Sequence, residues 1–493
     1  MNRRDLLKLA GCGTAGAALA SLSSRAFPQP KKRPNILFLF TDDQRFSTLN
    51  AINNPEVRTP TMDGLVSGGV TFTHNCIMGG TVGAVCAPSR AMMLTGQSLF
   101  HVTDSIVIPR SGPGSVARPF DLFPEVFQKA GYQTFGTGKW HNGSELYARC
   151  FNHGGNIFFG GMADHLQVPV QDFDPSGRYP AARQHTGEKF SSELFSDSAV
   201  NFLRNYKSDD PFLMYVAYTA PHDPRMAPKQ YTDLYPWQKI KLPGNFLPQH
   251  PFDNGELRIR DEMLAPFPRT PEIVKQNIAA YYAMITEVDA QMARVLAALR
   301  ESGHADDTIV VFAADNGLAV GQHGLMGKQN LYDHSIRVPL VIGGPGVRRG
   351  TRTDSLCYLL DLFPTLCEMA GVATPGTVEG KSLKPLLAHP AASIRDSVFL
   401  AYRNFQRGVR TRDWKFIVYN VQGKQTTQLF DLRQDPLETN NLAGDAAQVG
   451  RVRELRDLLK KWMRDTEDRM DLDKPDWGQA AAGDPQPAEF AFD

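Results

Sequence analysis

Residues 36–43 read Ile-Leu-Phe-Leu-Phe-Thr-Asp-Asp. Five consecutive apolar residues predict a β-strand buried on both faces, which is typical of a parallel strand covered by helices on each side. A threonine and two aspartates follow at once, so the strand delivers polar side chains at its C-terminal end. Ligands bind outside that edge in an open α/β sheet. The stretch therefore predicts an α/β fold with a polar site after this strand.

Three further stretches have the same organisation. The strand-like segment 132–135 leads to Lys139 and His141. The segment 212–218 leads to His222, and 308–312 leads to Asp315 and Asn316. Because the C-terminal ends of parallel strands share one edge of a sheet, these side chains are expected to meet Asp42 and Asp43 there. We expect a large mixed, mostly parallel sheet flanked by helices.

Composition limits the class of protein. The chain has 493 residues and a net charge of +1, so no overall field would hold it on nucleic acid or on an anionic membrane. Hydrophobic residues make up 42% and charged residues 21%, which is ordinary for a globular protein. Six cysteines are too few for a disulfide scaffold of this length. No segment after the N-terminus is apolar enough to cross a membrane.

The remaining segments suggest how the chain is divided. Apolar residues at helical spacing predict a helix over 271–302, where Gly303 would cap its end. The Gly- and Pro-rich stretch 371–390 suggests a boundary, and strand-like segments at 398–403, 415–419 and 428–431 precede an amphipathic helix at 449–464. We predict a catalytic domain at 34–390, a smaller C-terminal α+β subdomain (antiparallel sheet and helix) at 391–470, and a loose tail at 471–493.

The N-terminus is typical of an export signal. Arg3 and Arg4 precede a weakly apolar, Gly- and Ala-rich stretch at 9–22, and small residues suitable for cleavage follow near residue 26. This pattern resembles a twin-arginine signal peptide over 1–26 and indicates a periplasmic or secreted protein. Residues 9–12 are also similar to a lipoprotein box, so a lipid anchor at Cys12 is the second interpretation.

One local string points to a nucleophile. Cys86 begins Cys-Ala-Pro-Ser-Arg, Pro88 suits the first turn of a helix, and Gly96 would end that helix about two turns later. Free N–H groups and the helix dipole favour an anion at such an N-terminus. Cys86 is therefore placed to attack an oxyanion ester, although a buried structural cysteine is the alternative.

The chain is similar to the type I sulfatases of the alkaline phosphatase superfamily. Cys86, Pro88, Ser89 and Arg90 with Thr95-Gly96 resemble the family's first signature, and 131–141 resembles the second, with Thr137 as a mild departure. Further similar segments are 59–72, 315–317, 323–324, 327–328, 337–339 and 429–442. The resemblance runs from about residue 35 to 442, with its motifs in the family's order.

The resemblance implies that Cys86 is oxidised to formylglycine. One hydroxyl of the hydrated aldehyde would take the sulfuryl group, and the other would help to expel sulfate and regenerate the aldehyde. A serine would be left as a stable sulfate ester. The implied partners are a sulfate ester substrate and a formylglycine-generating or anaerobic maturation enzyme.

The resemblance also implies a metal site and a set of anion-binding residues. Asp42, Asp43, Asp315 and Asn316, together with Cys86, match the metal ligands. Their hard oxygen donors suit Ca²⁺, with Mg²⁺ possible. Arg90, Lys139, His141 and Lys328 match residues that hold the formylglycine and the sulfate, and His222 matches the candidate general acid. His323 is assigned a supporting role.

The remaining polar residues and cysteines carry less information. Residues 142–189 are interpreted as pocket-forming loops, and six side chains in or near the motif segments are candidates for the substrate side: His101, His153, His165, Arg178, His185 and Arg225. Taken individually, each of them is more often a solvated surface group. Four cysteines besides Cys86 follow the signal (Cys76, Cys150, Cys357 and Cys367), and disulfides or free thiols are both open.

The sequence thus predicts an exported sulfatase that hydrolyses a sulfate ester, with carbohydrate as the expected substrate. A phosphonate monoester or phosphodiester hydrolase of the same superfamily is the alternative enzyme. An inactive relative that binds a sulfated glycan is the alternative from another class.

Overall fold

The computed structural model of the protein describes residues 33–102, 119–475 and 477, and the chain from Pro34 onward forms one compact unit. The predicted export signal and Cys12 lie outside the described residues. No helix in the described part of the chain combines the length and the apolar character needed to cross a membrane.

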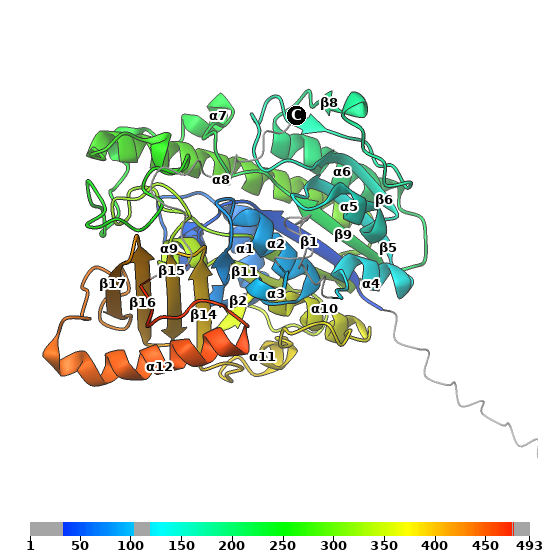
Figure 1. Ribbon diagram of the computed structural model, residues 1–493. Helices are drawn as coiled ribbons and strands as arrows, with labels where there is room; N and C mark the ends of the chain where they lie inside the picture. Colours follow the sequence, from blue (N-terminus) through cyan, green and yellow to red (C-terminus); the bar gives the residue numbers. More distant parts are fainter. Residues whose placement is uncertain (1–32, 103–118, 476, 478–493) are drawn as a thin grey trace, which may run out of the picture. The chain divides into compact units, whose positions relative to one another are not determined.

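An eight-stranded sheet forms the centre of this unit, in the order β12-β2-β11-β10-β1-β9-β5-β6 (Figure 1). Strands β10, β1, β9, β5 and β6 are parallel neighbours, whereas β11 pairs antiparallel with β10 and β2. The bounds are β1 Asn35–Thr41, β2 Gly69–Phe72, β5 Gln133–Lys139, β6 His153–Phe158, β9 Phe212–Ala217, β10 Thr308–Ala314, β11 Leu340–Gly343 and β12 Thr351–Thr353. The predicted large, mixed and mostly parallel sheet is confirmed.

Side chains of β1 alternate between two hydrophobic cores, one on each face of the sheet. Phe38 and Phe40 pack into the first core, and Leu37 and Leu39 pack into the second. The first core includes residues of α2 Cys86–Thr95, α4 Phe123–Lys129, α5 Ser144–Cys150 and α10 Leu362–Ala370; the second includes residues of α1 Pro60–Gly68, α6 Ser191–Asn205 and α8 Pro271–Glu301. This two-sided burial explains why the strand is apolar at each of the positions 36–40.

The C-terminal part of the chain forms a second sheet, in the order β17-β16-β15-β14-β4, with α12 Val449–Asp465 packed along it (Figure 1). Its antiparallel strands are β14 Ser397–Tyr402, β15 Gln406–Thr411, β16 Trp414–Val421 and β17 Lys424–Asp431. The predicted C-terminal sheet and helix are confirmed, and β15 is an additional strand that the sequence does not predict.

Strand β4, Gly79–Gly80, joins this sheet to the segment that leads to Cys86. It pairs in parallel with β14, and a Cβ at Gly79 would lie 2.0 Å from the carbonyl oxygen of Ala401. Glycine is required there because the two backbones approach so closely. The C-terminal sheet therefore contacts the chain six residues before the candidate nucleophile.

The described fold also contains shorter strands and α-helices. They are β3 Asn75–Cys76 paired with β13 Cys357–Tyr358, β7 Pro169–Val170 paired with β8 His185–Thr186, and the short helices α3 Leu99–Val102, α7 Lys229–Thr232, α9 Asp333–Ile336 and α11 Lys384–Ala388. Leu472 and Trp477 are buried, so this part of the predicted loose tail is packed against the fold. Residue 476 and residues 478–493 lie outside the described part.

Candidate active site

The four predicted strand ends meet at one edge of the large sheet. Strands β5, β9, β1 and β10 are consecutive neighbours, and β1 is in register with β10 up to the pair Thr41 and Ala314. The ten residues predicted for catalysis and metal binding lie together at or beside this edge: Asp42, Asp43, Cys86, Arg90, Lys139, His141, His222, Asp315, Asn316 and Lys328. Every one of them except His141, which is partly exposed, is buried.

Cys86 is the first residue of α2, and Gly96 ends this helix in a left-handed conformation, as the sequence predicts. The thiol is 1% exposed. Its Sγ lies 3.2 Å from His141 Nδ1, 3.7 Å from Lys139 Nζ and 3.9 Å from Lys328 Nζ. Burial raises the pKa of the thiol despite these two lysines, so the unmodified cysteine is held as a neutral thiol.

Two lysines bring positive charge to Cys86, one from the end of β5 and one from the segment between β10 and α9. Lys139 ends β5, forms an ion pair with Asp42, and donates to the carbonyl oxygen of Gly161 at 2.5 Å. Lys328 Nζ lies 2.8 Å from Asp43 Oδ1. Burial by itself would lower the pKa of Lys328, but Asp43 and its neighbours outweigh this and hold the pKa well above its usual value. The lysine is therefore charged at neutral pH.

Arg90 lies beneath the nucleophile, one helical turn into α2. Its Nε donates to Asp315 Oδ2 at 2.8 Å, and its Nη1 donates to the carbonyl oxygen of Lys139 at 2.8 Å. The guanidinium also lies over the ring of Phe40, 4.9 Å from its centroid. Arg90 thus connects the nucleophile helix to three strands of the sheet (β10, β5 and β1).

The carboxylates after β1 and β10 form a cluster next to Cys86. Asn316 Nδ2 donates to Asp43 Oδ1 at 2.6 Å, and the backbone N–H of Asp43 donates to Asp315 Oδ1 at 3.1 Å. Burial opposes the charge of Asp42, but Lys139 and nearby cations hold its pKa below the usual range. Burial and the charge of Asp42 instead raise the pKa of Asp315. The two buried carboxylates are therefore electrostatically coupled.

This cluster fits a hard divalent cation. One donor atom each of Asp42, Cys86 and Asp315 lies within 4.8 Å of the others, and the same holds for Asp42, Asp43 and His222. Among the described residues, the buried atoms Asp42 Oδ1 and Asn316 Oδ1 have no hydrogen-bond partner. Buried oxygen atoms without a partner are costly unless something binds them. Carboxylate and amide oxygens are the ligands that Ca²⁺ and Mg²⁺ prefer.

Two residues of the site have left-handed backbone conformations. Asp43 has a φ of 62° and His141 a φ of 55°. Such conformations are uncommon for residues other than glycine and cluster at functional sites. At Asp43 the surroundings hold the backbone in place, since Tyr281 O–H donates to its carbonyl oxygen at 2.6 Å.

His222 follows β9 and faces the carboxylate cluster. Its Nε2 lies 3.6 Å from Asp43 Oδ2, and its Nδ1 lies 2.8 Å from the carbonyl oxygen of Asp223. A carbonyl oxygen can only accept, so Nδ1 carries a hydrogen and Nε2 points into the site. The side chain of Asp223 in turn holds Arg260 through contacts of 2.5 and 3.1 Å.

The side chains expected on the substrate side differ in their surroundings. His153, Arg178 and His185 are exposed, and His101 forms an ion pair with Glu379. Arg225 lies close enough to Asp43 and Asp223 to interact with their charges, and its Nη1 donates to Asn277 Oδ1 at 2.6 Å. His165 is buried beneath the backbone of His222. His323, the residue with the expected supporting role, stacks on Tyr332 with ring centroids 4.0 Å apart.

Several residues that support the site carry no sequence signal of their own. The spacing of Tyr281 predicts only a core residue of the long helix, yet it hydrogen-bonds the backbone of Asp43. Ser89 Oγ donates to the carbonyl oxygen of Asp315 at 2.5 Å, and only its place in the Cys86 motif could have indicated this. The Asp223–Arg260 pair joins segments that are 37 residues apart. Such contacts depend on tertiary structure.

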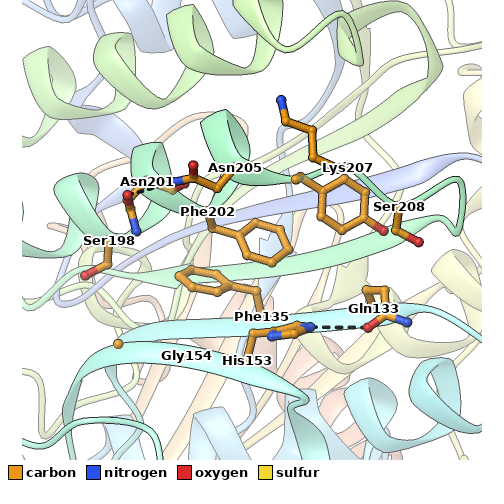
Figure 2. A pocket seen from close by; sticks show the side chains of 12 residues that line it. Gln133, Phe135, His153, Gly154, Ser198, Asn201, Phe202, Asn205, Lys207 and Ser208 are labelled. Carbon is orange, nitrogen blue, oxygen red and sulfur yellow. Dashed lines mark hydrogen bonds between the residues drawn. The ribbon is translucent and has the colours of Figure 1, made fainter.

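A cavity of about 600 Å³ lies elsewhere, where β5 and β6 begin (Figure 2). Phe135 and Phe202 stack in it with ring centroids 4.5 Å apart, and His153, Asn201 and Lys207 are among the residues that line it. The candidate active site is at the opposite end of β5, about six residues and thus roughly 20 Å along the strand. The cavity is therefore separate from the Cys86 site.

The described cysteines are all free thiols. Cys76, Cys86, Cys150, Cys357 and Cys367 are buried and unpaired by disulfides. Burial raises the pKa of Cys76 to about 11, so this thiol is neutral at ordinary pH. It shares a stretch of sequence with Cys86 but has neither of the two lysines near its sulfur.

Comparison with known protein families identifies the chain. The sequence profile of the sulfatase family matches residues 34–372, and a profile described as N-sulphoglucosamine sulphohydrolase, C-terminal, matches residues 321–465. The chain therefore belongs to the sulfatase family, as a type I sulfatase of the alkaline phosphatase superfamily. It is a sulfuric ester hydrolase.

Individual relatives cover most of the chain. An N-acetylglucosamine-6-O-sulfatase from Bacteroides thetaiotaomicron is 28% identical in an alignment that covers 92% of this chain and 90% of that protein. An arylsulfatase from Clostridium perfringens is also 28% identical, over 88% of this chain and 95% of its own.

Solved structures share the fold. One is a protein in complex with its substrate D-glucosamine-2-N,6-O-disulfate, with a TM-score of 0.74 and 24% identity. The match covers 90% of this chain and 100% of the chain in that structure. A phosphonate monoester hydrolase of Agrobacterium radiobacter has a TM-score of 0.69 and 21% identity. This match covers 88% of this chain and 96% of the chain in that structure. At these identities the likeness concerns the fold alone.

Proposed function

We propose that this sulfatase removes sulfate from a carbohydrate ester through a formylglycine formed from Cys86, with the ten residues of the site in the roles described below. The observation that carries the proposal is the convergence of Lys139, Lys328 and His141 on the Sγ of Cys86, at 3.7, 3.9 and 3.2 Å. Buried cations around a nucleophile suit an anionic ester and its charged transition state.

When formed, the hydrated aldehyde supplies one hydroxyl that attacks sulfur and a second whose deprotonation releases sulfate and regenerates the aldehyde. Lys139 and Lys328 hold the sulfate oxygens, since both ammonium groups are buried beside the nucleophile. His141 hydrogen-bonds the nucleophile side chain. Arg90 fixes the helix N-terminus that carries it, through its bonds to Asp315 and to the backbone of Lys139.

His222 is the proposed general acid. Its Nδ1 is occupied by the carbonyl oxygen of Asp223, so Nε2 is the atom that faces the site. A proton at Nε2 would pass to the ester oxygen as the S–O bond breaks, which lets the alcohol leave in neutral form. The role matters most for alcohols of high pKa, such as the hydroxyls of sugars.

The proposed metal is Ca²⁺, with Mg²⁺ as the alternative. Asp42, Asp43, Asp315 and Asn316 would hold it, together with the modified side chain of Cys86. The unpartnered oxygens of Asp42 and Asn316 support this assignment. When bound, the cation supplies positive charge that polarises the sulfate group.

A carbohydrate substrate is supported by the relatives. The similar protein from Bacteroides thetaiotaomicron is an N-acetylglucosamine-6-O-sulfatase, and the similar solved structure contains a disulfated glucosamine. The N-terminal pattern adds a proposed twin-arginine export to the periplasm or beyond, where polysaccharides are available. A formylglycine-generating or anaerobic maturation enzyme is then the required partner.

Two alternatives remain for the site. A phosphonate monoester hydrolase shares the fold at a TM-score of 0.69, so phosphonate or phosphodiester hydrolysis is the second enzymatic candidate. The other is an inactive relative that binds a sulfated glycan. The full set of buried charged residues around Cys86 favours an active enzyme over a binding protein.

The test compares matched esters on the metal-loaded protein. We expect higher kcat/KM for 4-nitrophenyl sulfate than for phenyl phosphonate mono-(4-nitrophenyl) ester and bis-(4-nitrophenyl) phosphate. Sulfated monosaccharides, followed by sulfate release, then identify the sugar. Preference for the phosphorus esters would favour the second candidate, and turnover of none with measurable glycan affinity would favour the binding protein.

A further inference from the structure

His165 is a buried histidine outside the ten predicted site residues. It lies in the segment between β6 and β7, is 1% exposed, and stacks on Phe190 with ring centroids 5.2 Å apart. Its Nε2 lies 2.9 Å from the carbonyl oxygen of His222, and its Nδ1 lies 2.7 Å from Ser191 Oγ. Both ring nitrogens therefore have a polar partner.

The direction of each hydrogen bond in this network follows from its partners. A carbonyl oxygen only accepts, so His165 Nε2 carries the hydrogen and donates to His222. Nδ1 is then an acceptor, and the hydroxyl of Ser191 donates to it. Thr219 Oγ1 donates to Ser191 Oγ at 2.8 Å, which completes a chain from Thr219 to His222. Burial lowers the pKa of His165 to about 4, in agreement with a neutral ring.

The segment that carries His165 also contacts the active site at two other points. The carbonyl oxygen of Gly161 accepts from Lys139, and the Sδ of Met162 lies 2.9 Å from Arg260 Nη1. Arg260 in turn pairs with Asp223, the residue after His222. The segment thus contacts the carbonyl oxygen of His222 directly and Asp223 only through Arg260, and His165 is its buried attachment.

We propose that His165 is a positioning residue for His222. By holding the carbonyl oxygen of His222, it fixes the turn after β9 so that Nε2 of His222 faces the leaving oxygen of the ester. Ser191 and Thr219 hold the imidazole of His165 in the required tautomer. This inference rests on the proposed function, because it assumes that His222 protonates the leaving group.

The experiment uses two substitutions of His165 that separate its two contacts. In H165Q the amide nitrogen can reach the position of Nε2 and still donate to His222. In H165N the shorter amide reaches the position of Nδ1 and loses the bond to His222. The substrates are 4-nitrophenyl sulfate, whose phenoxide leaves easily, and phenyl sulfate, whose leaving group needs a proton more.

For H165N in the metal-loaded enzyme, we expect kcat to fall roughly tenfold or more for phenyl sulfate and about threefold or less for 4-nitrophenyl sulfate. H165Q should recover most of this loss. H222A is the reference and should show the same pattern more strongly. H250Q is the matched control, because His250 is also buried and its Nδ1 lies 2.9 Å from the carbonyl oxygen of His323. H250Q should change the stability of the protein and leave the ratio of the kcat values for the two substrates unchanged.

Each alternative outcome has a distinct meaning. If H222A shows the leaving-group pattern and H165N does not, the inference about His165 is wrong and the proposed role of His222 stands. If H222A lowers both rates equally, the general-acid role fails and the inference fails with it. Loss of activity in H165N and H165Q alike, with lower melting temperatures and an unchanged substrate ratio, would assign His165 a merely structural role.

Discussion

At the scale of single residues, the Cys86 site depends on side chains that are fixed before any substrate arrives. Arg90 illustrates this, because two of its nitrogens are committed to Asp315 and to the backbone of Lys139. Its charge is also buried, and burial makes such a side chain difficult to replace. The geometry of the guanidinium therefore matters as much as its charge.

Replacing Arg90 with lysine should lower kcat by about 100-fold or more, since one ammonium group cannot reach both partners. Steady-state kinetics with 4-nitrophenyl sulfate measures this effect. R183K is the control, since Arg183 is exposed and pairs with Asp174 at the surface. Near-normal kcat in R90K would show that charge alone is sufficient at this position.

At the scale of elements, strand β5 positions Lys139 through a glycine. Gly138 has a φ of 87°, and a Cβ there would lie 1.8 Å from the carbonyl oxygen of Ala217 on β9. Gly131 has a similar φ of 90°, but a Cβ there would meet no atom within 4 Å apart from its chain neighbours. Alanine substitutions at these two glycines therefore separate the cost of the backbone conformation from the cost of the steric contact.

G131A is expected to cost about 1 kcal/mol of unfolding free energy, from backbone strain alone. G138A should cost about 3 kcal/mol or more and lower activity as well, because β5 and Lys139 must shift away from β9. Urea unfolding of the two variants and of the parent protein provides the comparison. Equal destabilisation would contradict the close approach of the two strands.

Helix α8 contains a buried acid with an altered titration. Burial raises the pKa of Glu287 from 4.5 to about 7. The folded protein therefore binds this proton more tightly than the unfolded chain, and the unfolding free energy falls as pH rises from about 4.5 to about 7. Glutamine at this position has no such titration.

E287Q should accordingly be similar to the parent protein at pH 5 and more stable at pH 8, by about 2 kcal/mol. Thermal unfolding at the two pH values tests this. E272Q serves as the control, since Glu272 lies exposed in the first turn of the same helix. A difference of the same size at both pH values would mean that the carboxyl is not the cause.

The elements also show which parts of the fold and of the site could be predicted from the sequence. Three of the four strand ends and the Cys86 helix could be predicted from apolar runs and from a proline and a glycine at the two ends of the helix, because these are local signals. The end of β5 is indicated by the polar residues Lys139 and His141 that follow its start. Strand β15 could not be predicted, because its side chains include Arg407 and Arg410, which are buried through pairs with Asp468 and Asp333. His165 and Tyr281 also reach the site through contacts that no local pattern encodes.

At the scale of the whole described unit, buried charges join the C-terminal sheet to the segment between strands β10 and β11 of the large sheet. Lys415 of β16 is fully buried and lies 2.5 Å from Asp333 Oδ1 and 2.5 Å from Glu438 Oε1. Asp333 begins α9, five residues after Lys328. The network therefore connects the C-terminal sheet to the segment that delivers a proposed sulfate-binding lysine.

K415M should destabilise the protein by about 3–5 kcal/mol, because it leaves the buried Glu438 without its ion-pair partner and removes one of the cations that pair with Asp333. The loss should appear in one cooperative transition if both sheets unfold together. K424M is the control, since Lys424 at the start of β17 is exposed. Two separate transitions in the K415M variant would instead show that the sheets are independent.

The whole proposed mechanism depends on the conversion of Cys86 to formylglycine. Mass spectrometry of the tryptic peptide 59–90, from protein made in its native host, tests this directly, because the peptide also contains Cys76 as an internal control. We predict an aldehyde at Cys86 and an ordinary thiol at Cys76. A plain thiol at both positions in catalytically active protein would contradict the mechanism.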